Sequence, residues 1–209
     1  MTRRPLPVLA LLGLLAACAP TTPPAPGPEA HGVDLVTRDA WGAAPAVGPM
    51  RPHEIDRITV HHTAWNQQPE RPLDDKLQAL QRFSQSEEEV APGRMKEAWA
   101  DIPYHYYIDV HGRVAEARSV RYAGDTNTDY DPAGHLLIVL EGNFEEDEPT
   151  AEQLASLERM LRWGASRWDI PADRVDGHDD HASTLCPGRN LKRHLPALRQ
   201  ALGGNSGAR

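Results

Sequence analysis

The segment from His178 to Cys186 carries the clearest chemical signal in this 209-residue sequence. The two residues are separated by seven others, in a stretch without a helical apolar pattern, so a loop could bring both side chains to one ion. An imidazole and a thiolate together favour zinc over magnesium or calcium, which prefer oxygen ligands. Two ligands alone make a weak site, so a third must come from elsewhere in the chain.

Two other segments offer histidines to such a site. His61 and His62 stand at the end of a β-rich run, and Tyr104-His105 opens another. Neighbouring residues of a strand point to opposite faces, but both faces of a sheet can be buried, so strand parity leaves the choice between His61 and His62 open. Three protein ligands leave a fourth position for water, as in a catalytic zinc site, and zinc can activate water for amide hydrolysis.

Several other functional classes are excluded by what the sequence lacks. It contains no HExxH helix of the thermolysin type and no GxSxG elbow of a serine hydrolase. The formal net charge is −8, and an acidic surface repels phosphate backbones, so we expect no nucleic-acid partner.

The first residues are typical of an export signal. Arg3 and Arg4 form a positive region, and Val8 to Leu15 form an apolar core that is too short to span a bilayer. We therefore expect residues 1–17 to be a signal peptide. Cleavage near Ala17 as an ordinary secretory peptide is the alternative to a lipoprotein signal.

Cys18 favours the lipoprotein interpretation. The run Leu15-Ala16-Ala17-Cys18 resembles the lipobox of bacterial lipoproteins, whose cysteine receives a lipid, and Ala19 after it favours the outer membrane, facing the periplasm. With Cys18 lipidated, Cys186 is the one free thiol of an exported protein, which metal ligation would explain. The alternative is a Cys18–Cys186 disulfide.

The chain length is that of one domain with tails. Residues 18–32 contain a Pro-rich run without bulky apolar residues, which predicts an extended tether after the lipidated cysteine. We expect the folded domain over residues 33–202 and a frayed tail over 203–209. The acidic segment 86–100 is interpreted as an irregular surface insertion.

Hydrophobic periodicity predicts alternating strands and helices. Apolar and β-branched runs indicate strands, and leucines at helical spacing, with a capping box from Thr150 to Gln153, indicate helices. This pattern predicts a single α/β domain with a central mixed sheet flanked by helices. The expected strands cover 55–62, 104–110, 113–117 (a hairpin with the preceding strand) and the buried run 136–140. The expected helices start near 73 and 150 and, with Pro196 at its first position, at 196.

The motifs around the histidines resemble the type 2 N-acetylmuramoyl-L-alanine amidases, which share their fold with peptidoglycan recognition proteins. The similarity covers roughly residues 35–198 and rests on three runs in the family's order: ITVHHTA, DIPYHY, and GH with TLCPG. The resemblance implies zinc ligation by His61, His178 and Cys186, and so it selects His61 over His62. The cysteine ligand places the chain with the extracellular branch of the family.

The same resemblance assigns roles to three further residues, and a fourth, His181, is a candidate because it lies inside the loop from His178 to Cys186. Tyr104 matches a tyrosine that stabilises the oxyanion, although it could instead be a core aromatic. Thr184 stands where phage enzymes have a lysine, and it could hold water or substrate. Glu141 is either a catalytic carboxylate or a structural partner of a nearby loop. His181 is either a group that orients a ligand imidazole or a solvated loop residue.

The expected function is therefore zinc-dependent hydrolysis of the bond between N-acetylmuramic acid and L-alanine in peptidoglycan or muropeptides. We expect a monomer held at a membrane by its N-terminal lipid. Two alternatives stay open: a non-catalytic peptidoglycan-binding module, and a structural lipoprotein with an incidental His/Cys cluster. The presence of all three expected ligands argues against the first.

Overall fold

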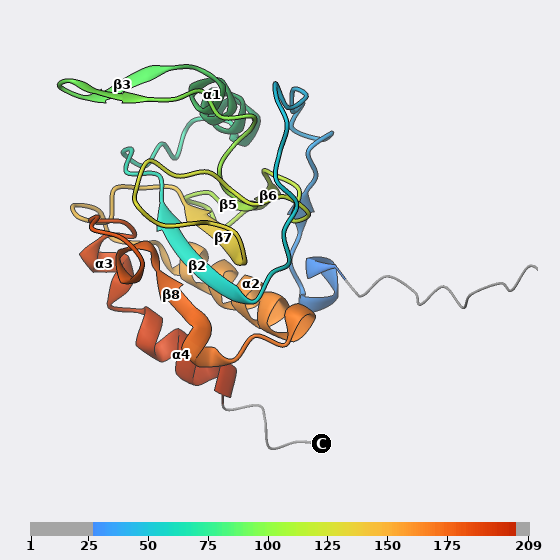
Figure 1. Cartoon of the computed structure of the whole chain (residues 1–209). Coiled ribbons are helices and arrows are strands. Elements are labelled where there is room, and N and C mark those ends of the chain that lie inside the picture. The colour runs from blue at the N-terminus through green and yellow to red at the C-terminus, as the bar shows by residue number, and fades with distance from the viewer. Residues whose placement is uncertain (1–26, 204–209) are drawn as a thin grey trace, which may run out of the picture.

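A six-stranded mixed sheet forms the centre of the protein, in a computed structural model that describes residues 27–203 (Figure 1). All neighbouring strands run parallel except β5 and β6, which form the expected antiparallel hairpin. In order across the sheet, the strands are β1 (Leu35–Val36), β6 (Val114–Glu116), β5 (Tyr106–Ile108), β7 (His135–Leu140), β2 (Arg57–His62) and β8 (Val175–Gly177). The sequence-based prediction of a mixed α/β sheet is confirmed.

Strand β7 is buried along its whole length, as its continuous apolar run predicts. It lies between β5 and β2, and all six of its residues are buried. A strand that is covered on both faces needs no polar alternation.

Helices α2 (Ala151–Trp168) and α4 (Leu195–Gly203) cover one face of the sheet. Their leucines share an apolar cluster with Ile58 and Val60 of β2. Helix α2 starts at the predicted capping box, in which the Thr150 hydroxyl accepts from the Gln153 amide at 3.0 Å and the Gln153 side chain accepts from the Thr150 amide at 3.1 Å. Each end of this motif satisfies an amide that the first helical turn leaves free.

Helix α1 (Leu73–Gln85) covers part of the opposite face. Its three leucines pack in an apolar cluster with Trp41, Tyr107 and Val139, and no residue of β2 belongs to that cluster. On this face β2 instead presents Thr59 and His61, which share it with Val139 because paired residues of parallel strands point the same way. The polar part of this face holds the candidate site.

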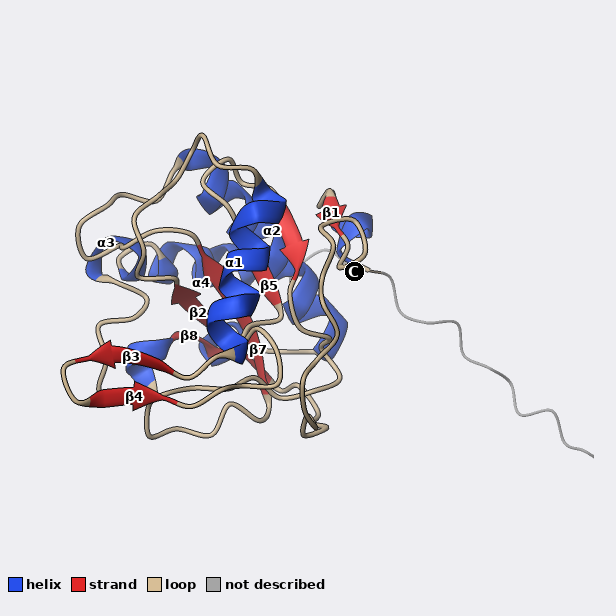
Figure 2. Ribbon diagram, turned by 90° about the horizontal axis from the view of Figure 1, so that it is seen from above, coloured by secondary structure: helices blue, strands red, loops and turns tan. Residues whose placement is uncertain are grey.

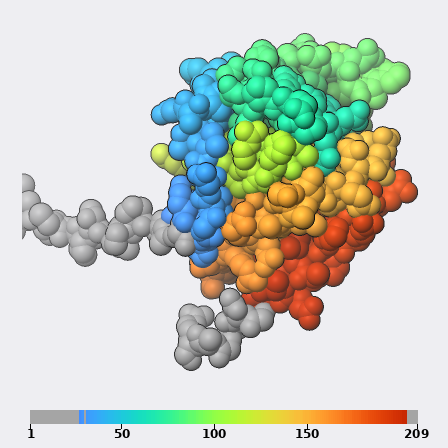
Figure 3. All heavy atoms as spheres, turned by 180° about the vertical axis from the view of Figure 1, so that it is seen from behind, coloured from blue at the N-terminus to red at the C-terminus, as the bar shows by residue number. Residues whose placement is uncertain are grey.

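Short helices complete the described chain. The 3-10 helix η1 (Pro28–His31) packs against α2, and the space-filling view shows the blue N-terminal segment lying against the orange one (Figure 3). Residues 1–26 and 204–209, which include the expected signal peptide, Cys18 and tail, lie outside the described residues. Between residues 27 and 203 no helix is long and apolar enough to cross a membrane. The remaining short helices are η2 (Ala172–Arg174), η3 (His178–Asp180) and α3 (Arg189–Lys192).

The expectation of an irregular segment at residues 86–100 is wrong. Strands β3 (Glu88–Ala91) and β4 (Arg94–Lys96) form an antiparallel hairpin that projects from the domain (Figure 2). The Lys96 side chain is buried, and its ammonium donates to the carbonyls of Ser84, Ser86 and Glu97 at 3.0, 2.6 and 2.7 Å. Composition identified the surface location but missed this lysine, which fastens the hairpin to the end of α1.

Candidate metal centre and its surroundings

The parallel pairing of β2 and β8 brings His61 and His178 together. Val60 of β2 is in register with Gly177, the last residue of β8, so the residues that follow them, His61 and His178, lie at the same edge of the sheet. The two imidazole centroids are 4.7 Å apart. Carboxyl ends of neighbouring parallel strands commonly hold the functional groups of α/β proteins.

Cys186 reaches the histidines from the loop that precedes α3. Thr184 Oγ1 accepts a hydrogen bond from the Cys186 amide at 3.2 Å, which closes the turn carrying the cysteine. Two residues later Gly188 has a φ of 91°, and a Cβ on it would lie 2.5 Å from the carbonyl carbon of Phe144. Glycine at this position therefore lets the loop dock closely on the segment after β7.

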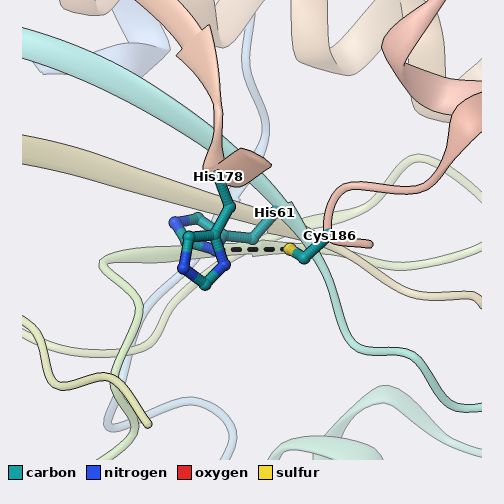
Figure 4. Close-up of side chains that lie close together, drawn as sticks. All are labelled: His61, His178 and Cys186. Carbon is teal, nitrogen blue, oxygen red and sulfur yellow. Dashed lines mark hydrogen bonds between the residues drawn. The ribbon is translucent and has the colours of Figure 1, made fainter. Parts of the chain in front are cut away.

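The three side chains converge as a possible metal-binding group (Figure 4). One ligand atom from each of His61, His178 and Cys186 lies within 4.8 Å of the others. His61 Nδ1 is 3.5 Å from Cys186 Sγ. Zinc bonds of about 2.0 Å to nitrogen and about 2.3 Å to sulfur, at a tetrahedral angle, place two such ligands about 3.5 Å apart. The donor set and this separation fit zinc.

Burial keeps the three groups uncharged. It lowers the pKa of His61 well below its ordinary value and that of His178 to about 4, and it raises the pKa of the Cys186 thiol to about 12. His61 Nε2 is buried and has no hydrogen-bond partner among the described residues. Buried polar atoms in proteins are nearly always paired, so Nε2 marks a place for water or a bound molecule beside the group, whereas Nδ1 is the nitrogen that faces Cys186 Sγ.

The His62 side chain lies on the opposite face of β2 and is not part of the group, whereas the His62 backbone amide donates to Cys186 Sγ at 3.4 Å. Its Nδ1 accepts a hydrogen bond from the Phe144 amide at 3.2 Å, in the region packed against α2 and α4. Strand parity could not choose between the two histidines, and the structure brings His61 to the candidate ligands.

Tyr104 stands beside the group, with its ring centroid 5.1 Å from that of His61. Burial, and to a smaller extent the nearby Cys186 sulfur, raises the pKa of the Tyr104 phenol above its ordinary value. The phenol is therefore protonated at neutral pH and can donate a hydrogen bond. The next residue, His105, points to the β7 backbone, where its Nδ1 accepts from the Leu137 amide at 2.9 Å.

Glu141 has structural partners on both of its oxygens. Oε1 accepts from the Gln68 amide at 2.7 Å, and Oε2 accepts from the Lys76 ammonium at 2.8 Å and the Val110 amide at 3.0 Å. These contacts tie the loop after β2 and helix α1 to the end of β7. Of the two roles considered from the sequence, the geometry matches the structural partner of a loop.

His181 contacts residues around the group. Its Nε2 is 3.5 Å from a carboxylate oxygen of Asp176, and its ring stacks on that of Tyr130 at 5.9 Å. A side chain that does hydrogen-bond to a candidate ligand is Thr128, whose Oγ1 lies 2.8 Å from His178 Nε2. Sequence reasoning missed Thr128 and Tyr130 because their polar segment has the composition of an ordinary turn.

Comparison with known proteins finds relatives of this fold. The chain is 30% identical over 167 residues to "Peptidoglycan-recognition protein SD" of Drosophila melanogaster, covering 76% of this chain and 82% of that protein. The crystal structure of that Drosophila protein superposes with a TM-score of 0.68 at 28% identity, over 78% of this chain and 93% of the other.

Two further solved structures share the fold at 24% identity. The N-acetylmuramoyl-L-alanine amidase LysC from Clostridium intestinale URNW has a TM-score of 0.62 and covers 81% of this chain and 97% of its own. A complex of tracheal cytotoxin with the ectodomains of the peptidoglycan recognition proteins LCa and LCx has a TM-score of 0.64, covering 77% of this chain and 93% of the matched one.

The family model described as "N-acetylmuramoyl-L-alanine amidase" matches residues 51–189, which is more than half of the chain. The matched range contains the two histidines, the cysteine and Tyr104, together with the strands that position them. By this match, this protein is a member of the N-acetylmuramoyl-L-alanine amidase family.

Proposed function

We propose that this protein is a zinc-dependent amidase that hydrolyses the bond between N-acetylmuramic acid and L-alanine in peptidoglycan or muropeptides. The observation that carries the proposal is the convergence of His61, His178 and Cys186 within 4.8 Å, at one edge of the sheet. Two imidazoles and one thiolate leave a coordination position for a reacting group, as in catalytic zinc sites. Membership of the amidase family supports the same substrate class.

The chain's own residues divide the chemistry between them. His61, His178 and Cys186 would hold the cation, which when bound supplies a Lewis acid that activates water and polarises the amide carbonyl. Tyr104 is protonated and adjacent to His61, so its phenol can donate to the carbonyl oxygen as negative charge develops there. Thr184 fixes the turn that presents Cys186, and its other lone pair can hold water or substrate. The leaving group is the amine of L-alanine.

A digestion with defined substrates tests the proposal. Purified protein is incubated with sacculi, soluble muropeptides and anhydro-ended muropeptides, with and without a chelator, and the products are analysed by mass spectrometry. We expect free stem peptides beginning with L-alanine, loss of this release after chelation, and recovery with added Zn²⁺. Intact substrates after incubation with the zinc-loaded protein would refute the proposal.

The second candidate function is peptidoglycan binding without cleavage. It is favoured by the similarity to proteins named for recognition, including one in complex with tracheal cytotoxin. The same digestion separates the two functions, because a binding module would sediment with sacculi and release no peptide. A structural lipoprotein would neither sediment with sacculi nor retain zinc after dialysis.

We also propose that the protein acts as a monomer that is anchored through a lipid on Cys18 at the outer membrane, facing the periplasm. The support is the lipobox-like run that ends at Cys18. Labelling with a fatty acid, compared between the native chain and Cys18→Ala, tests the anchor, and membrane fractionation tests its location. Export without label would favour the ordinary secretory peptide.

A further inference from the structure

The loop between β6 and β7 contacts the His178 ring on the side of its Nε2 atom. Thr128 Oγ1 lies 2.8 Å from His178 Nε2, and the Tyr130 ring centroid lies 4.9 Å from that of His178. One nitrogen of the ring is therefore engaged by the protein. Nδ1 is the nitrogen left for a cation shared with His61 and Cys186.

A second hydroxyl extends this contact. Thr126 Oγ1 lies 2.7 Å from Thr128 Oγ1 and also accepts a hydrogen bond from the Thr128 amide at 3.1 Å. The hydrogen bonds that link Thr126, Thr128 and His178 can run in two directions. Either His178 Nε2–H donates to Thr128, which donates to Thr126, or both donations are reversed.

The two directions have opposite consequences for the metal centre. A neutral imidazole carries one proton, so a hydrogen bond donated to Nε2 would put that proton on Nδ1 and block ligation. If Nε2–H is the donor, Nδ1 keeps its lone pair free. Outer hydrogen bonds of this kind orient ligand imidazoles and select their tautomer in metal sites.

The loop that carries Thr128 is held firmly at its beginning. Asp125 forms an ion pair with Arg118, whose guanidinium is buried. The same guanidinium donates to the carbonyls of Asp101 and Ile102 at 2.9 and 2.7 Å. Because these residues precede Tyr104, one arginine fastens both the loop and the segment that leads to the phenol.

Gly124 brings the same two segments into close contact. A Cβ on Gly124 would lie 2.2 Å from the Pro103 carbonyl oxygen and 2.3 Å from a methyl carbon of Leu137, so no other residue fits without displacing the backbone. The position of the Thr128 hydroxyl is thus set by packed backbone and by an ion pair whose arginine is buried.

We propose that Thr128 is a positioning residue for His178: its hydroxyl accepts the Nε2 proton, donates to Thr126, and so holds the tautomer that presents Nδ1 to the cation. The proposal rests on the proposed zinc centre. Thr128 acts through His178 and has no assigned contact with substrate.

Three variants test the proposal. Thr128→Val keeps the shape and removes the hydroxyl, Thr128→Ser keeps the hydroxyl, and Thr126→Val removes the next group of the chain as the matched control. We expect Thr128→Val to weaken zinc binding about 10- to 100-fold, as is typical when a residue that hydrogen-bonds to a metal ligand is mutated. Thr128→Ser should bind zinc as the native protein does, and Thr126→Val should lose less than Thr128→Val.

Two readouts separate positioning from a general structural role. Zinc affinity is measured by competition with a chromophoric chelator, and the His178 tautomer is read from long-range nitrogen–proton NMR of the zinc-free protein. We expect the Nε2–H tautomer in the native protein and a mixture in Thr128→Val, with unchanged urea unfolding. Unaltered affinity of Thr128→Val, or an Nδ1–H tautomer in the native protein, would overturn the proposal. Thr128→Ala replaces Thr128→Val if the latter does not fold.

The outcome can be distinguished from that of the amidase proposal. Zinc binding that depends on Thr128, in a protein that releases no stem peptide, would support this inference and refute the amidase. Chelator-sensitive peptide release, together with a zinc affinity that does not depend on Thr128, would support the amidase proposal and refute the role of Thr128.

Discussion

Two clusters of buried polar side chains lie at the carboxyl ends of neighbouring strands, and they differ in whether the chain completes them. Around Glu141, after β7, both carboxylate oxygens have partners: a lysine ammonium and two backbone amides, at 2.7 to 3.0 Å. Around His61, at the end of β2, an imidazole nitrogen has no partner among the described residues, and a thiol faces an imidazole at 3.5 Å. A cluster that satisfies itself holds the fold together, whereas one that does not is built for a ligand.

The largest expected effect on metal binding and activity is the removal of a ligand from the His61 cluster. Cys186→Ser replaces the sulfur with a poor zinc donor. If the roughly 10–16 kcal/mol of a four-ligand zinc site is divided among its ligands, the loss is about 2.5–4 kcal/mol, or roughly 70- to 900-fold in zinc affinity, and peptide release should fall to background. Metal content after dialysis and digestion of muropeptides check this. If Cys186→Ser still held one zinc ion per chain after dialysis, Cys186 would not be a zinc ligand.

The matching change in the Glu141 cluster should affect folding and leave metal binding intact. Lys76→Met strands the buried Glu141 carboxylate, and breaking such a pair typically costs about 3–5 kcal/mol in the free energy of unfolding. The double variant Lys76→Met/Glu141→Gln should recover part of that loss, because no unpaired charge is left.

Urea unfolding, with zinc content measured on the folded fraction, checks the Glu141 cluster. The two clusters are functionally distinct if Lys76→Met keeps one zinc per folded chain. If Glu141→Gln kept full stability but lost peptide release, Glu141 would belong to the chemistry and the comparison would fail.

A smaller effect is expected at the edge of the His61 cluster. Tyr104→Phe keeps the ring beside His61 and removes the hydroxyl, so zinc binding and stability should not change. Loss of one oxyanion donor typically lowers kcat by about 100-fold or more, close to 3 kcal/mol. The measurement is kcat on a defined muropeptide at saturating substrate. A variant with the native kcat would make Tyr104 a packing residue.

The sequence was sufficient for features set by local pattern. The capping box at Thr150 and the apolar run of β7 each depend on neighbouring residues, and both are found where the pattern placed them. Lys96 is a residue whose environment could not be predicted from the local sequence pattern. Its burial depends on carbonyls contributed by the end of α1, and nothing in the acidic residues around it encodes that contact.

Part of the candidate site could be predicted from the sequence, and part of it could not. Residue types and spacing pointed to His178 and Cys186 and left the choice between His61 and His62 open, because both faces of the strand can be buried. The preference for His61 came from the family resemblance. Thr128 could not be found at all. Its role depends on a loop 50 residues from His178 in sequence, whose first residues are tied to Arg118 through the Arg118–Asp125 ion pair.

The smallest expected effect is a pH dependence that belongs to the His61 cluster. Burial raises the pKa of the Cys186 thiol to about 12 and lowers that of His178 to about 4, so near pH 7 the free site is a neutral thiol beside neutral imidazoles. Zinc binds the thiolate, so each ion displaces one proton, and apparent affinity should rise about tenfold, or 1.4 kcal/mol, per pH unit.

Titration calorimetry in two buffers of different ionisation enthalpy measures that proton directly. Below pH 6 the dependence should stay close to one proton, because the His178 imidazole is still neutral there and adds no second proton until about pH 4. Release of no proton at pH 7 would mean that the thiol is already ionised in the free site. The His61 cluster would then hold an ionised group before the metal binds, as the Glu141 cluster does, and burial would not be enough to keep the thiol protonated.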